Sequence, residues 1–342
     1  MTVLLLGEYS NVHHTLCEAL RRAGHKVLLI SDGDGWKDYP RDVDLRRRQQ
    51  GPWGSLRYLM QLATLLPRLR GYDVVQLINP VFLDVKARKL LYVPRPGEKL
   101  ETTVAVAPVS KGIVELNGDR AKGRIVRDVA FRGIGFEHTS FVMGPGGQAA
   151  GQSVANVPDA VIRANGAEKV VLENCRVAHA AMHGIWLRNG CKDSAVRHCL
   201  VEDLGAGGVY FGDVSADFEN RENNAADLEI VDSIVRHGGR LMNGGIGVWI
   251  GKAHDCSVVR NDIYDFLYTG VSSGWTWGYA ETINRNLKVN HNRIHHIGQG
   301  VLSDMGGFYS LGDHTGSEVR NNWVWEVNGY ADNGSPAWGL YT

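Results

Sequence analysis

Residues 231–237 read VDSIVRH, and residues 290–296 read NHNRIHH. In both stretches an apolar residue stands at the fifth position and a histidine at the seventh. Short runs rich in Val and Ile, with polar residues between the apolar ones, are typical of β-strands and not of helices. Each stretch is too short to form a stable sheet by itself, so the rest of the chain has to supply its partners.

The same pattern recurs through most of the chain. Seven stretches align without gaps: RGIGFEH (132–138), ENCRVAH (173–179), RHCLVED (197–203), VDSIVRH (231–237), RNDIYDF (260–266), NHNRIHH (290–296) and RNNWVWE (320–326). The last five begin at intervals of 34, 29, 30 and 30 residues. Their fifth positions are all apolar: Phe136, Val177, Val201, Val235, Tyr264, Ile294 and Val324. One such unit cannot bury its own apolar face, so the repeat predicts a solenoid of stacked units.

A second, glycine-led motif recurs after these units. It reads GIWL (184–187), GVYFG (208–212), GVWIG (247–251), GVSSG (270–274), GFYSLG (307–312) and GLYT (339–342). Coils with two or three short strands each predict a mainly β fold, a right-handed parallel β-helix of the pectate-lyase-like kind. A propeller would need four longer strands per blade, and a leucine-rich repeat would need a regular leucine pattern, so neither fits.

Polar residues also repeat at fixed positions of the units. Asn and Asp recur at the second or third position, where we expect turns and side-chain ladders: Asn174, Asp232, Asn261, Asn292 and Asn321. The seventh positions form a second column, with rungs spaced by about 4.8 Å: His138, His179, Asp203, His237, Phe266, His296 and Glu326. Six of these seven residues titrate, which favours a polar groove over satisfied turn residues. No tight H-x-H or H-x-x-x-H spacing accompanies them, so we expect no metal site and no cofactor.

Aromatic residues accumulate near the glycine-led motifs. Along the stretch GWTWGY (274–279), a strand would place both indoles on one face. Flat apolar rings with polar edges suit pyranose faces, and the alternative is a packing ladder or an edge cap. We therefore predict sugar contacts from aromatic and histidine side chains, namely Trp249, Trp275, Trp277, Tyr279, Tyr309, His179 and His237.

The stretch HHIGQGVLSDMGG (295–307) is the candidate catalytic loop. Asp304 is bracketed by Gly300, Gly306 and Gly307, which would let the backbone turn sharply near a ligand. A carboxylate there could act as nucleophile or general base in glycosidic cleavage, and a turn-capping Asp is the alternative. His296 and Glu326 are its candidate catalytic partners.

The first 82 residues follow α/β rules instead. Strands are predicted at Val3–Leu6, Lys26–Ile30 and Asp73–Ile78, with helices at about Val12–Ala23 and Leu56–Leu69, and Gly24 as a helix C-terminal cap. The stretches GEYSNVHHTLCEALRRAGHKV, SDGDGWKDYPRD and YDVVQLINP resemble the start of a GT-B type glycosyltransferase, a family built from two Rossmann domains. This resemblance implies a small Rossmann-like segment over residues 1–82, without the domain that holds the nucleotide sugar.

The bulk composition limits the partners. The formal net charge is zero, which argues against nucleic-acid binding. The five cysteines form no C-x-x-C pair, so we expect buried free thiols. No apolar run is long enough to span a membrane, and MTVLLLGEYS lacks the basic start of a signal peptide, so the chain as written is expected in the cytoplasm.

Residues 83–342 resemble carbohydrate-active β-helix proteins close to glycoside hydrolase family 141. The matching stretches are LLYVPRPGE, FRGIGFEHTSF, HGIWL, DLGAGGVYFG, HGGR, GIGVWIG, DFLYTGVSSGWTWGY and NRIHHIGQGVLSDMGGFYSLG. The resemblance implies action on a plant or algal poly- or oligosaccharide, with Asp304 in the aspartate-containing signature. It also implies a further acidic segment after Thr342, so we expect a fusion whose β-helix is truncated at its C-terminus.

Three functions therefore remain open. A glycoside-hydrolase-like enzyme would lose activity in Asp304→Asn. A non-catalytic carbohydrate-binding scaffold would keep binding in Asp304→Asn and lose it in Trp275→Ala or Trp277→Ala. A polysaccharide lyase would need an acidic calcium site and an Arg or Lys base, whereas the acidic residues here are scattered.

Overall fold

The computed structural model describes residues 1–6, 12–31, 40–45, 60–61, 64–65, 67, 72, 74–77, 81–84, 89–92, 102, 104–143, 147–149, 151–330 and 337–342. Its contacts group the chain into two units, Met1–Ala105 and Val106–Thr342. This division and the boundary predicted after residue 82 differ in where they place residues 83–105. Within the described residues, no helix is long and apolar enough to cross a membrane.

The first unit contains a small parallel sheet. Its strands β1 (Thr2–Leu6), β2 (Lys26–Ser31), β3 (Val43–Asp44) and β4 (Val74–Leu77) lie in the order β3-β2-β1-β4. Helix α1 (Val12–Arg22) packs Leu16, Cys17 and Leu20 against Val3, Leu5 and Leu29. Gly24 follows α1 with φ of 82°, a left-handed conformation that suits a helix end.

These strands and the first helix agree with the α/β pattern of the sequence. Most of the second predicted helix, residues 56–69, lies outside the described residues. Strands β5 (Val81–Asp84) and β6 (Lys89–Tyr92) form an antiparallel pair within the same unit.

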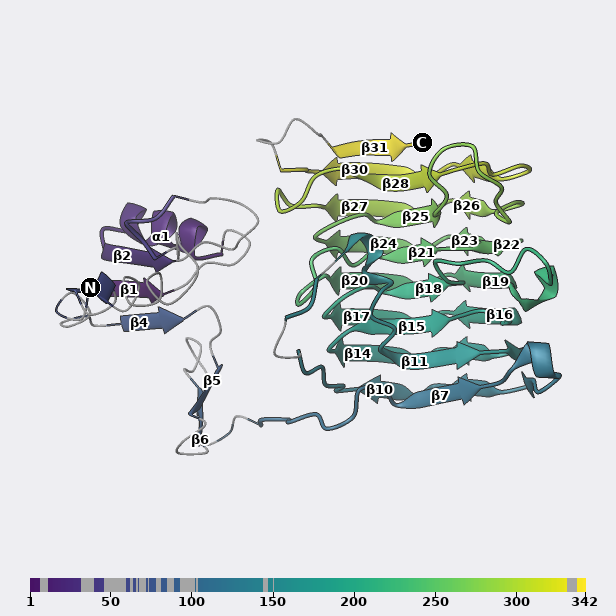
Figure 1. Ribbon diagram of the computed structural model, residues 1–342, viewed down its shortest axis with the longest axis horizontal. Coiled ribbons are helices and arrows are strands. Elements are labelled where there is room, and N and C mark those ends of the chain that lie inside the picture. Colours follow the sequence, from purple (N-terminus) through teal and green to yellow (C-terminus); the bar gives the residue numbers. More distant parts are fainter. Residues whose placement is uncertain are drawn as a thin grey trace. The chain divides into compact units, whose positions relative to one another are not determined.

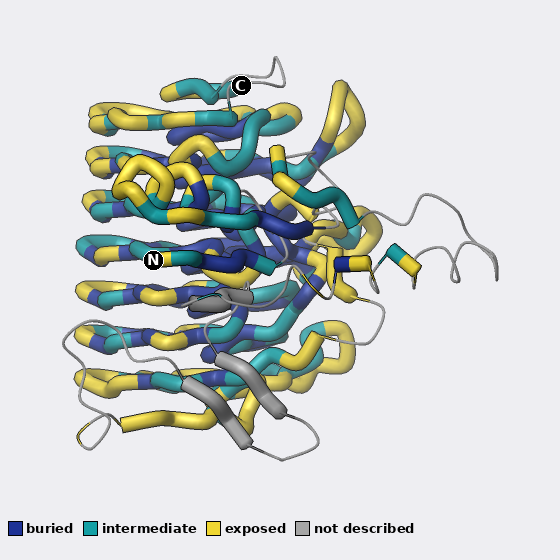
Figure 2. The backbone as a smooth tube through the Cα atoms, turned by 90° about the vertical axis from the view of Figure 1, so that its left-hand side faces the viewer, coloured by how far each residue is buried: buried dark blue, intermediate teal, exposed yellow. Residues whose placement is uncertain are grey.

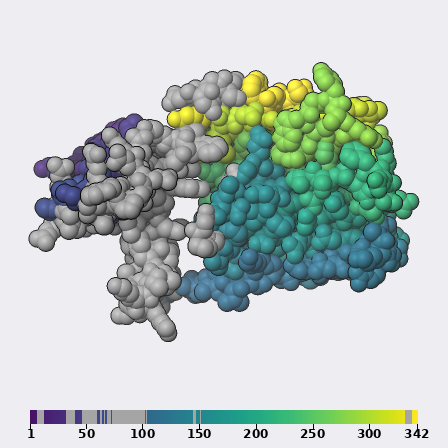
Figure 3. All heavy atoms as spheres, viewed as in Figure 1, coloured from purple at the N-terminus to yellow at the C-terminus, as the bar shows by residue number. Residues whose placement is uncertain are grey.

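The second unit is a parallel β-helix in which each coil contributes to three sheets (Figure 1). In the space-filling view of this unit, the colours change in layers from blue to yellow along the sequence (Figure 3). Sheet I has eight strands: β7 (Val114–Asn117), β11 (Ala160–Asn165), β15 (His183–Leu187), β18 (Val209–Phe211), β21 (Val248–Ile250), β25 (Val271–Gly274), β28 (Met305–Leu311) and β31 (Ala337–Tyr341). Sheet II contains β8 (Val126–Arg127), β9 (Ala130–Arg132), β12 (Ala167–Glu168), β13 (Val171–Glu173), β16 (Lys192–Arg197), β19 (Ala225–Val231), β22 (Ala253–His254), β23 (Ser257–Val259), β26 (Lys288–Asn290) and β29 (Glu318–Arg320). Sheet III has seven strands: β10 (Gly135–Glu137), β14 (Arg176–Ala180), β17 (Leu200–Leu204), β20 (Ile234–Gly238), β24 (Asp262–Phe266), β27 (Arg293–Ile297) and β30 (Trp323–Val327).

The interior of the coils is apolar. Figure 2 shows the buried segments gathered inside the stacked coils and the exposed residues toward their turns. All five cysteines are buried free thiols, as the sequence indicated. Three 3₁₀ turns interrupt the connections: η2 (Arg120–Lys122), η3 (Gln152–Val154) and η4 (Arg221–Asn223).

The register of sheet III corrects one of the seven aligned units. Val235 pairs with Ile263, and Ile263 pairs with Ile294, so Ile263 and not Tyr264 occupies the apolar column. The error arose because RNDIYDF was aligned one residue too late. The seventh-position column consequently contains Asp265 in place of Phe266, whose side chain is buried. Because side chains alternate along a strand, a shift of one residue exchanges an inside position for an outside one.

The glycine that leads the second motif is required by packing across the coil. A Cβ atom at Gly184 would lie 2.6 Å from Cγ1 of Val201 and 2.9 Å from the carbonyl oxygen of Gly208. Val201 belongs to the apolar column of sheet III, and Gly208 is the equivalent glycine of the next coil. The glycine of one motif and the apolar residue of the other therefore contact each other inside the coil.

The turn between sheets II and III carries an amide ladder that includes two of the five predicted residues, Asn261 and Asn292. The Asn292 Oδ1 atom accepts hydrogen bonds from the backbone N–H and the side-chain amide of Asn261, at 2.9 and 3.1 Å. Asn322 accepts from Asn292 in the same way, at 2.9 Å for both bonds. Asn322, and not the predicted Asn321, continues the ladder. Asn174, Asp232 and Asn321 occupy the preceding position, with φ between 50° and 54°.

Candidate active site

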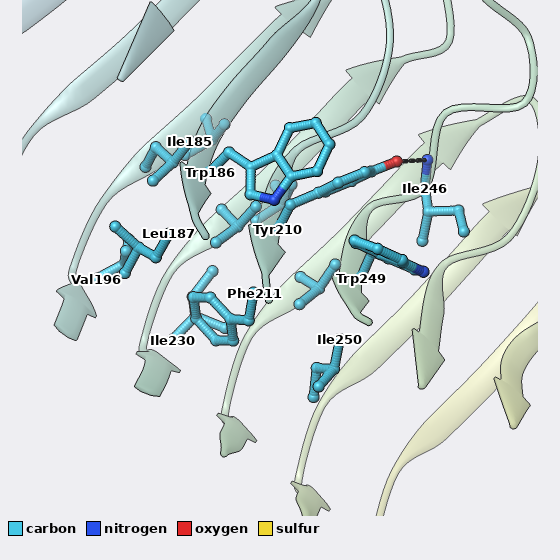
Figure 4. Close-up of a cluster of buried hydrophobic side chains, with 14 of the residues drawn as sticks. Ile185, Trp186, Leu187, Val196, Tyr210, Phe211, Ile230, Ile246, Trp249 and Ile250 are labelled. Atoms are coloured by element: carbon cyan, nitrogen blue, oxygen red, sulfur yellow. Dashed lines mark hydrogen bonds between the residues drawn. The ribbon is translucent and has the colours of Figure 1, made fainter. Parts of the chain in front are cut away.

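One column of side chains on sheet I leads to the candidate site. The register aligns Trp186, Tyr210, Trp249, Ser272, Tyr309 and Tyr341, which we call the outer column. Figure 4 shows Trp186, Tyr210 and Trp249 pointing away from Leu187, Phe211 and Ile250 of the same strands, as alternation requires. The outer column therefore lies on the face of sheet I that points away from the coil interior.

The first three coils of the outer column are covered by a segment that contains η3. The Tyr210 hydroxyl donates to the Ser153 carbonyl at 2.5 Å and accepts from the Ile246 N–H at 3.1 Å (Figure 4). Val154 and Val157 of the same segment pack against Met182 and other apolar residues of the adjacent turns. Trp186, Tyr210 and Trp249 are core side chains with no exposed surface, and Tyr210 is bonded directly to this segment.

His183 fixes the covering segment. Its Nε2 atom donates to the Val154 carbonyl at 3.2 Å, and its Nδ1 atom accepts from the Gly207 N–H at 3.2 Å. Burial lowers the pKa of His183 to about 4, so the ring is neutral at neutral pH. One donor and one acceptor is the hydrogen-bonding capacity of a neutral imidazole, so both nitrogens are satisfied.

The next coils of the outer column meet Asp304, where the cover ends. Gln152 donates from Nε2 to Asp304 Oδ2 at 3.2 Å and to the Tyr268 hydroxyl at 3.0 Å. The Tyr268 hydroxyl donates to the Asp304 backbone carbonyl at 2.7 Å. Tyr341 hydrogen-bonds to the Asp304 side chain, and its ring lies 4.4 Å from that of Tyr309. We call Asp304, Gln152, Tyr268, Tyr309 and Tyr341 the Asp304 cluster.

The phenols of the cluster are neutral. Burial, and after it neighbouring groups that include the Asp304 carboxylate, raises the pKa values of Tyr268 and Tyr309 well above that of a free tyrosine. The same two causes raise the pKa of Tyr341. Asp304 is half-buried, and in the described part of the chain its side-chain partners are the Gln152 amide and the Tyr341 phenol, with no Arg, Lys or His among them. The cluster thus surrounds the Asp304 carboxyl group with neutral hydrogen-bonding groups.

The loop before β28 gives Asp304 its position. Gly298, Gly300 and Asp304 itself have φ of 82°, 74° and 55°, so the turn uses two glycines and a left-handed aspartate. The sequence had assigned the turn partly to Gly306 and Gly307. Both lie inside β28, where Gly307 packs closely against Val324 of the opposite sheet.

The seventh positions of sheet III form the column that the sequence predicted, with Asp265 corrected. We call His138, His179, Asp203, His237, Asp265, His296 and Glu326 the polar column, and all seven have φ between 51° and 66°. Histidines and carboxylates pair between neighbouring coils: His179 Nδ1 lies 2.7 Å from Asp203 Oδ2, His237 Nδ1 lies 2.5 Å from Asp265 Oδ2, and His296 Nε2 lies 2.7 Å from Glu326 Oε2.

The structure brings together only some of the predicted catalytic residues. His296 and Glu326 form a pair with each other, and no hydrogen bond or ion pair among the described residues joins either of them to Asp304. Glu281, an exposed acidic residue, pairs with Arg221 at 2.5 Å. Among the described contacts, none therefore connects Asp304 with the paired carboxylates of the polar column.

The predicted sugar-binding aromatics differ widely in exposure. Trp249 is wrong as a surface contact, because its side chain is fully buried among the rings of Trp186, Tyr210 and Trp275. Tyr309 is also buried and belongs to the Asp304 cluster. Trp275 is half-buried, whereas Trp277 is 57% exposed and Tyr279 is fully exposed.

The indoles of Trp275 and Trp277 do not lie on a strand, as the sequence pattern assumed. Strand β25 ends at Gly274, and Trp275 follows it with φ of 122°. Its ring packs at 5.6 Å from Trp249 and 5.1 Å from Trp277. Trp277 is thus the exposed end of an aromatic chain that begins in the core.

Three residues of the Asp304 cluster were missed by sequence reasoning. Gln152, Tyr268 and Tyr341 come from three separate segments, and their contacts with Asp304 depend on the stacking of coils. Tyr341 could have been found, since it stands in the sixth glycine-led motif at the position of Trp186. Gln152 has no repeat position, and no signal in the sequence points to it.

Comparisons with known proteins concern the β-helix. A family model described as "Right handed beta helix region" matches residues 153–335. A solved structure named "Glycoside hydrolase" is similar with a TM-score of 0.66 and 23% identity, covering 74% of this chain and 49% of its own. This chain therefore spans about half the length of that glycoside hydrolase. The mannuronan C-5 epimerase AlgE4 A-module of Azotobacter vinelandii also matches, with a TM-score of 0.30 and 12% identity over 59% of this chain and 61% of that one. No curated protein sequence matches the chain.

Proposed function

This chain belongs to the right-handed β-helix family, and on that premise we propose that it acts on an oligo- or polysaccharide at the Asp304 cluster. The predicted right-handed parallel β-helix is confirmed, and the glycoside-hydrolase structure with the same fold agrees with it. The proposed activity is cleavage of glycosidic bonds, as the resemblance of residues 83–342 to glycoside hydrolase family 141 implies.

The observation that carries the proposal is the state of Asp304. In the described part of the chain it is a half-buried carboxylate held by neutral groups, whereas the carboxylates of the polar column have a histidine partner. A carboxylate without a counter-charge keeps its negative charge available for a ligand. It could serve as nucleophile, as general base toward water, or as the charge that stabilises an oxocarbenium-like transition state.

The surrounding groups suit a hydroxylated substrate. The Gln152 amide and the phenols of Tyr268 and Tyr341 surround Asp304 and can hold its orientation. Trp277, whose ring contact is with Trp275, offers a separate exposed apolar surface of the type on which a pyranose ring stacks. The hydroxyl and amide groups around Asp304 support a hydroxylated ligand such as a sugar.

A second function, carbohydrate binding without cleavage, is favoured by one specific observation. Glycosidic hydrolysis ordinarily uses two carboxyl groups, and none of the described contacts brings a second one to Asp304. The phenols are poor replacements as acids, because their pKa values are raised. The two functions differ in whether the bound sugar is broken.

The deciding experiment incubates the full chain with plant and algal oligosaccharides and measures new reducing ends. We expect Asp304→Asn to lower the rate by about 10²–10⁴-fold. The matched control is Asp232→Asn, since Asp232 shares the left-handed backbone conformation and is paired with Arg260 at 2.7 Å. Equal rates in both variants would remove Asp304 from catalysis.

Binding is measured on the same variants by calorimetry. Binding that survives Asp304→Asn and is lost in Trp277→Ala, with no cleavage in the wild type, would establish the binding scaffold instead. Products that absorb in the ultraviolet would indicate an unsaturated sugar and hence a lyase.

A further inference from the structure

We propose that Glu137, His138 and His179 bind one divalent transition-metal ion of the zinc class. The cluster lies at the first two coils of the polar column, on a different sheet from the Asp304 cluster. One ligand atom from each of the three residues falls within 4.8 Å of the others. Carboxylate oxygen and imidazole nitrogen are donors that zinc prefers in proteins.

The stacking of coils creates this cluster from residues that are distant in sequence. Phe136 pairs with Val177 and Glu137 pairs with Ala178, so the next register position places His138 beside His179. The His138 N–H donates to the Ala178 carbonyl at 3.3 Å, which extends the ladder to this position. A search for closely spaced histidines along the sequence misses such a site, because its spacing is set by the coil.

The two imidazoles are arranged side by side. Their backbones have φ of 66° and 52°, and their rings stack with centroids 4.7 Å apart and an angle of 11° between the planes. Zinc–nitrogen bonds of about 2.0–2.1 Å in a tetrahedral site bring two ligand nitrogens to about 3.3 Å with their lone pairs converging on the metal, so the rings have to approach and also tilt out of their parallel stack. Both side chains are more than a third exposed, which leaves them room to make this adjustment.

Asp203 orients the imidazole of His179 in a way that favours metal binding. Its Oδ2 atom lies 2.7 Å from His179 Nδ1. A carboxylate that accepts the Nδ1–H leaves the Nε2 lone pair free, and this is the usual support of a zinc-bound histidine. The pair thus fixes both the tautomer and the direction of the second imidazole.

The local charge tolerates a cation. Glu137 contacts Arg176 through Oε1, which leaves Oε2 at 3.8 Å from His138 Nε2. Arg176 and Arg236 both pair with Glu202, at 2.7 and 2.6 Å. The arginines contact Glu137 and Glu202, whereas Asp203 pairs with His179, so these two arginines and three carboxylates carry one net negative charge when the histidines are neutral.

A cavity supplies the open coordination position. A depression of about 310 Å³ is lined by His138, His179 and Asp203 together with Thr139, Arg240 and Leu241. Three protein ligands and one open position are the arrangement of a zinc ion that keeps a water or a substrate atom. The other histidines of the column pair with carboxylates, and within the described residues this cluster alone brings three ligand groups together.

The test titrates Co²⁺ and Zn²⁺ into the full chain after removal of metal with a chelator. We expect one equivalent of Co²⁺ to bind and give visible d–d absorption, and Zn²⁺ to displace it. His138→Ala and His179→Ala should each weaken the affinity at least 100-fold, and Asp203→Asn should weaken it about 10–100-fold. His237→Ala is the matched control, because His237 stands on the same column with a carboxylate partner.

The metal affinities of the control and of the ligand variants show whether these residues bind the ion. Binding that is unchanged in both histidine variants, or that falls as much in His237→Ala, would overturn the proposal. Binding of Ca²⁺ in place of Co²⁺ would overturn it as well. If circular dichroism shows that an alanine variant is unfolded, His138→Gln and His179→Gln, which keep side-chain volume, replace it and are judged by the same affinity loss.

Discussion

The outer column of sheet I has two regions that differ in their side chains and in what those side chains contact. On β15, β18 and β21, Trp186, Tyr210 and Trp249 are core residues, and Tyr210 hydrogen-bonds to the segment around η3. On β25, β28 and β31, the same register position holds Ser272, Tyr309 and Tyr341, and the two tyrosines lie beside Asp304. The same repeat position therefore supplies core side chains in one region and part of the candidate site in the other.

Gln152 stands where the two regions meet. It belongs to the covering segment through η3, and its amide reaches both Tyr268 and Asp304. The cover and the site are thus connected by one side chain. Disturbing the cover should affect stability, whereas disturbing the cluster should affect ligand chemistry.

The largest expected effect comes from charging His183 under the cover. Its pKa of about 4 lies below the ordinary value of 6.5, because burial disfavours the charged ring. A depressed pKa means that the stabilisation is complete above pH 6.5 and is lost as the pH falls toward 4. The loss amounts to about 3 kcal/mol of unfolding free energy, at about 1.4 kcal/mol per pH unit.

Denaturant unfolding at several values between pH 7.5 and pH 4 measures this effect. His183→Gln keeps a donor and an acceptor but cannot titrate, so its stability should fall less steeply over the same range. Other groups contribute to both curves, and the difference between them isolates His183. Parallel curves for the wild type and His183→Gln would show that protonation of this ring does not open the cover.

The next effect tests the interior contact that both regions share. Gly184→Ala should lower the unfolding free energy by about 2 kcal/mol, because the new Cβ would meet Val201 and the Gly208 carbonyl. Val201→Ala alone leaves a cavity, and the double variant removes the closer of the two clashes. We expect the double variant to be more stable than the sum of the two single losses predicts. Simple additivity would mean that the contact between the glycine motif and the apolar column is not the reason for the glycine.

A smaller effect concerns the Asp304 cluster and rests on the proposed activity. Tyr268→Phe removes the hydroxyl that donates to the Asp304 carbonyl at 2.7 Å and accepts from Gln152 at 3.0 Å. Loss of one positioning hydrogen bond should lower kcat/KM by about tenfold, equivalent to about 1.4 kcal/mol. Tyr264→Phe is the control, since the Tyr264 hydroxyl bonds to Arg236 on sheet III. An equal loss in both variants would indicate a general effect on the fold.

The contrast between the two regions also shows which structural features could be predicted from the sequence and which could not. The apolar column, the glycine column and the polar column repeat with each coil, so their existence could be predicted from the sequence, apart from the shift at Ile263. Burial of the aromatic residues of the outer column also depends on contacts outside the repeat, such as the segment around Ser153 on Tyr210 and Trp275 on Trp249. Trp249 was therefore assigned to the surface, and Gln152 was not identified at all.

The smallest effect should come from the polar column. Its histidines and carboxylates form exposed pairs, whereas the Asp304 cluster contains a single carboxyl group. His296 and Glu326 are each 53% exposed at the side chain, and exposed ion pairs contribute about 0–1 kcal/mol. His296→Ala should accordingly change the unfolding free energy by less than about 1 kcal/mol, with a still smaller effect at high salt. Cleavage or binding of sugar should also stay near the wild-type level, because no described contact links this pair to Asp304. A large loss of activity in His296→Ala, with stability unchanged, would instead join the two surfaces into one site and restore Glu326 as the second carboxyl group that Asp304 lacks.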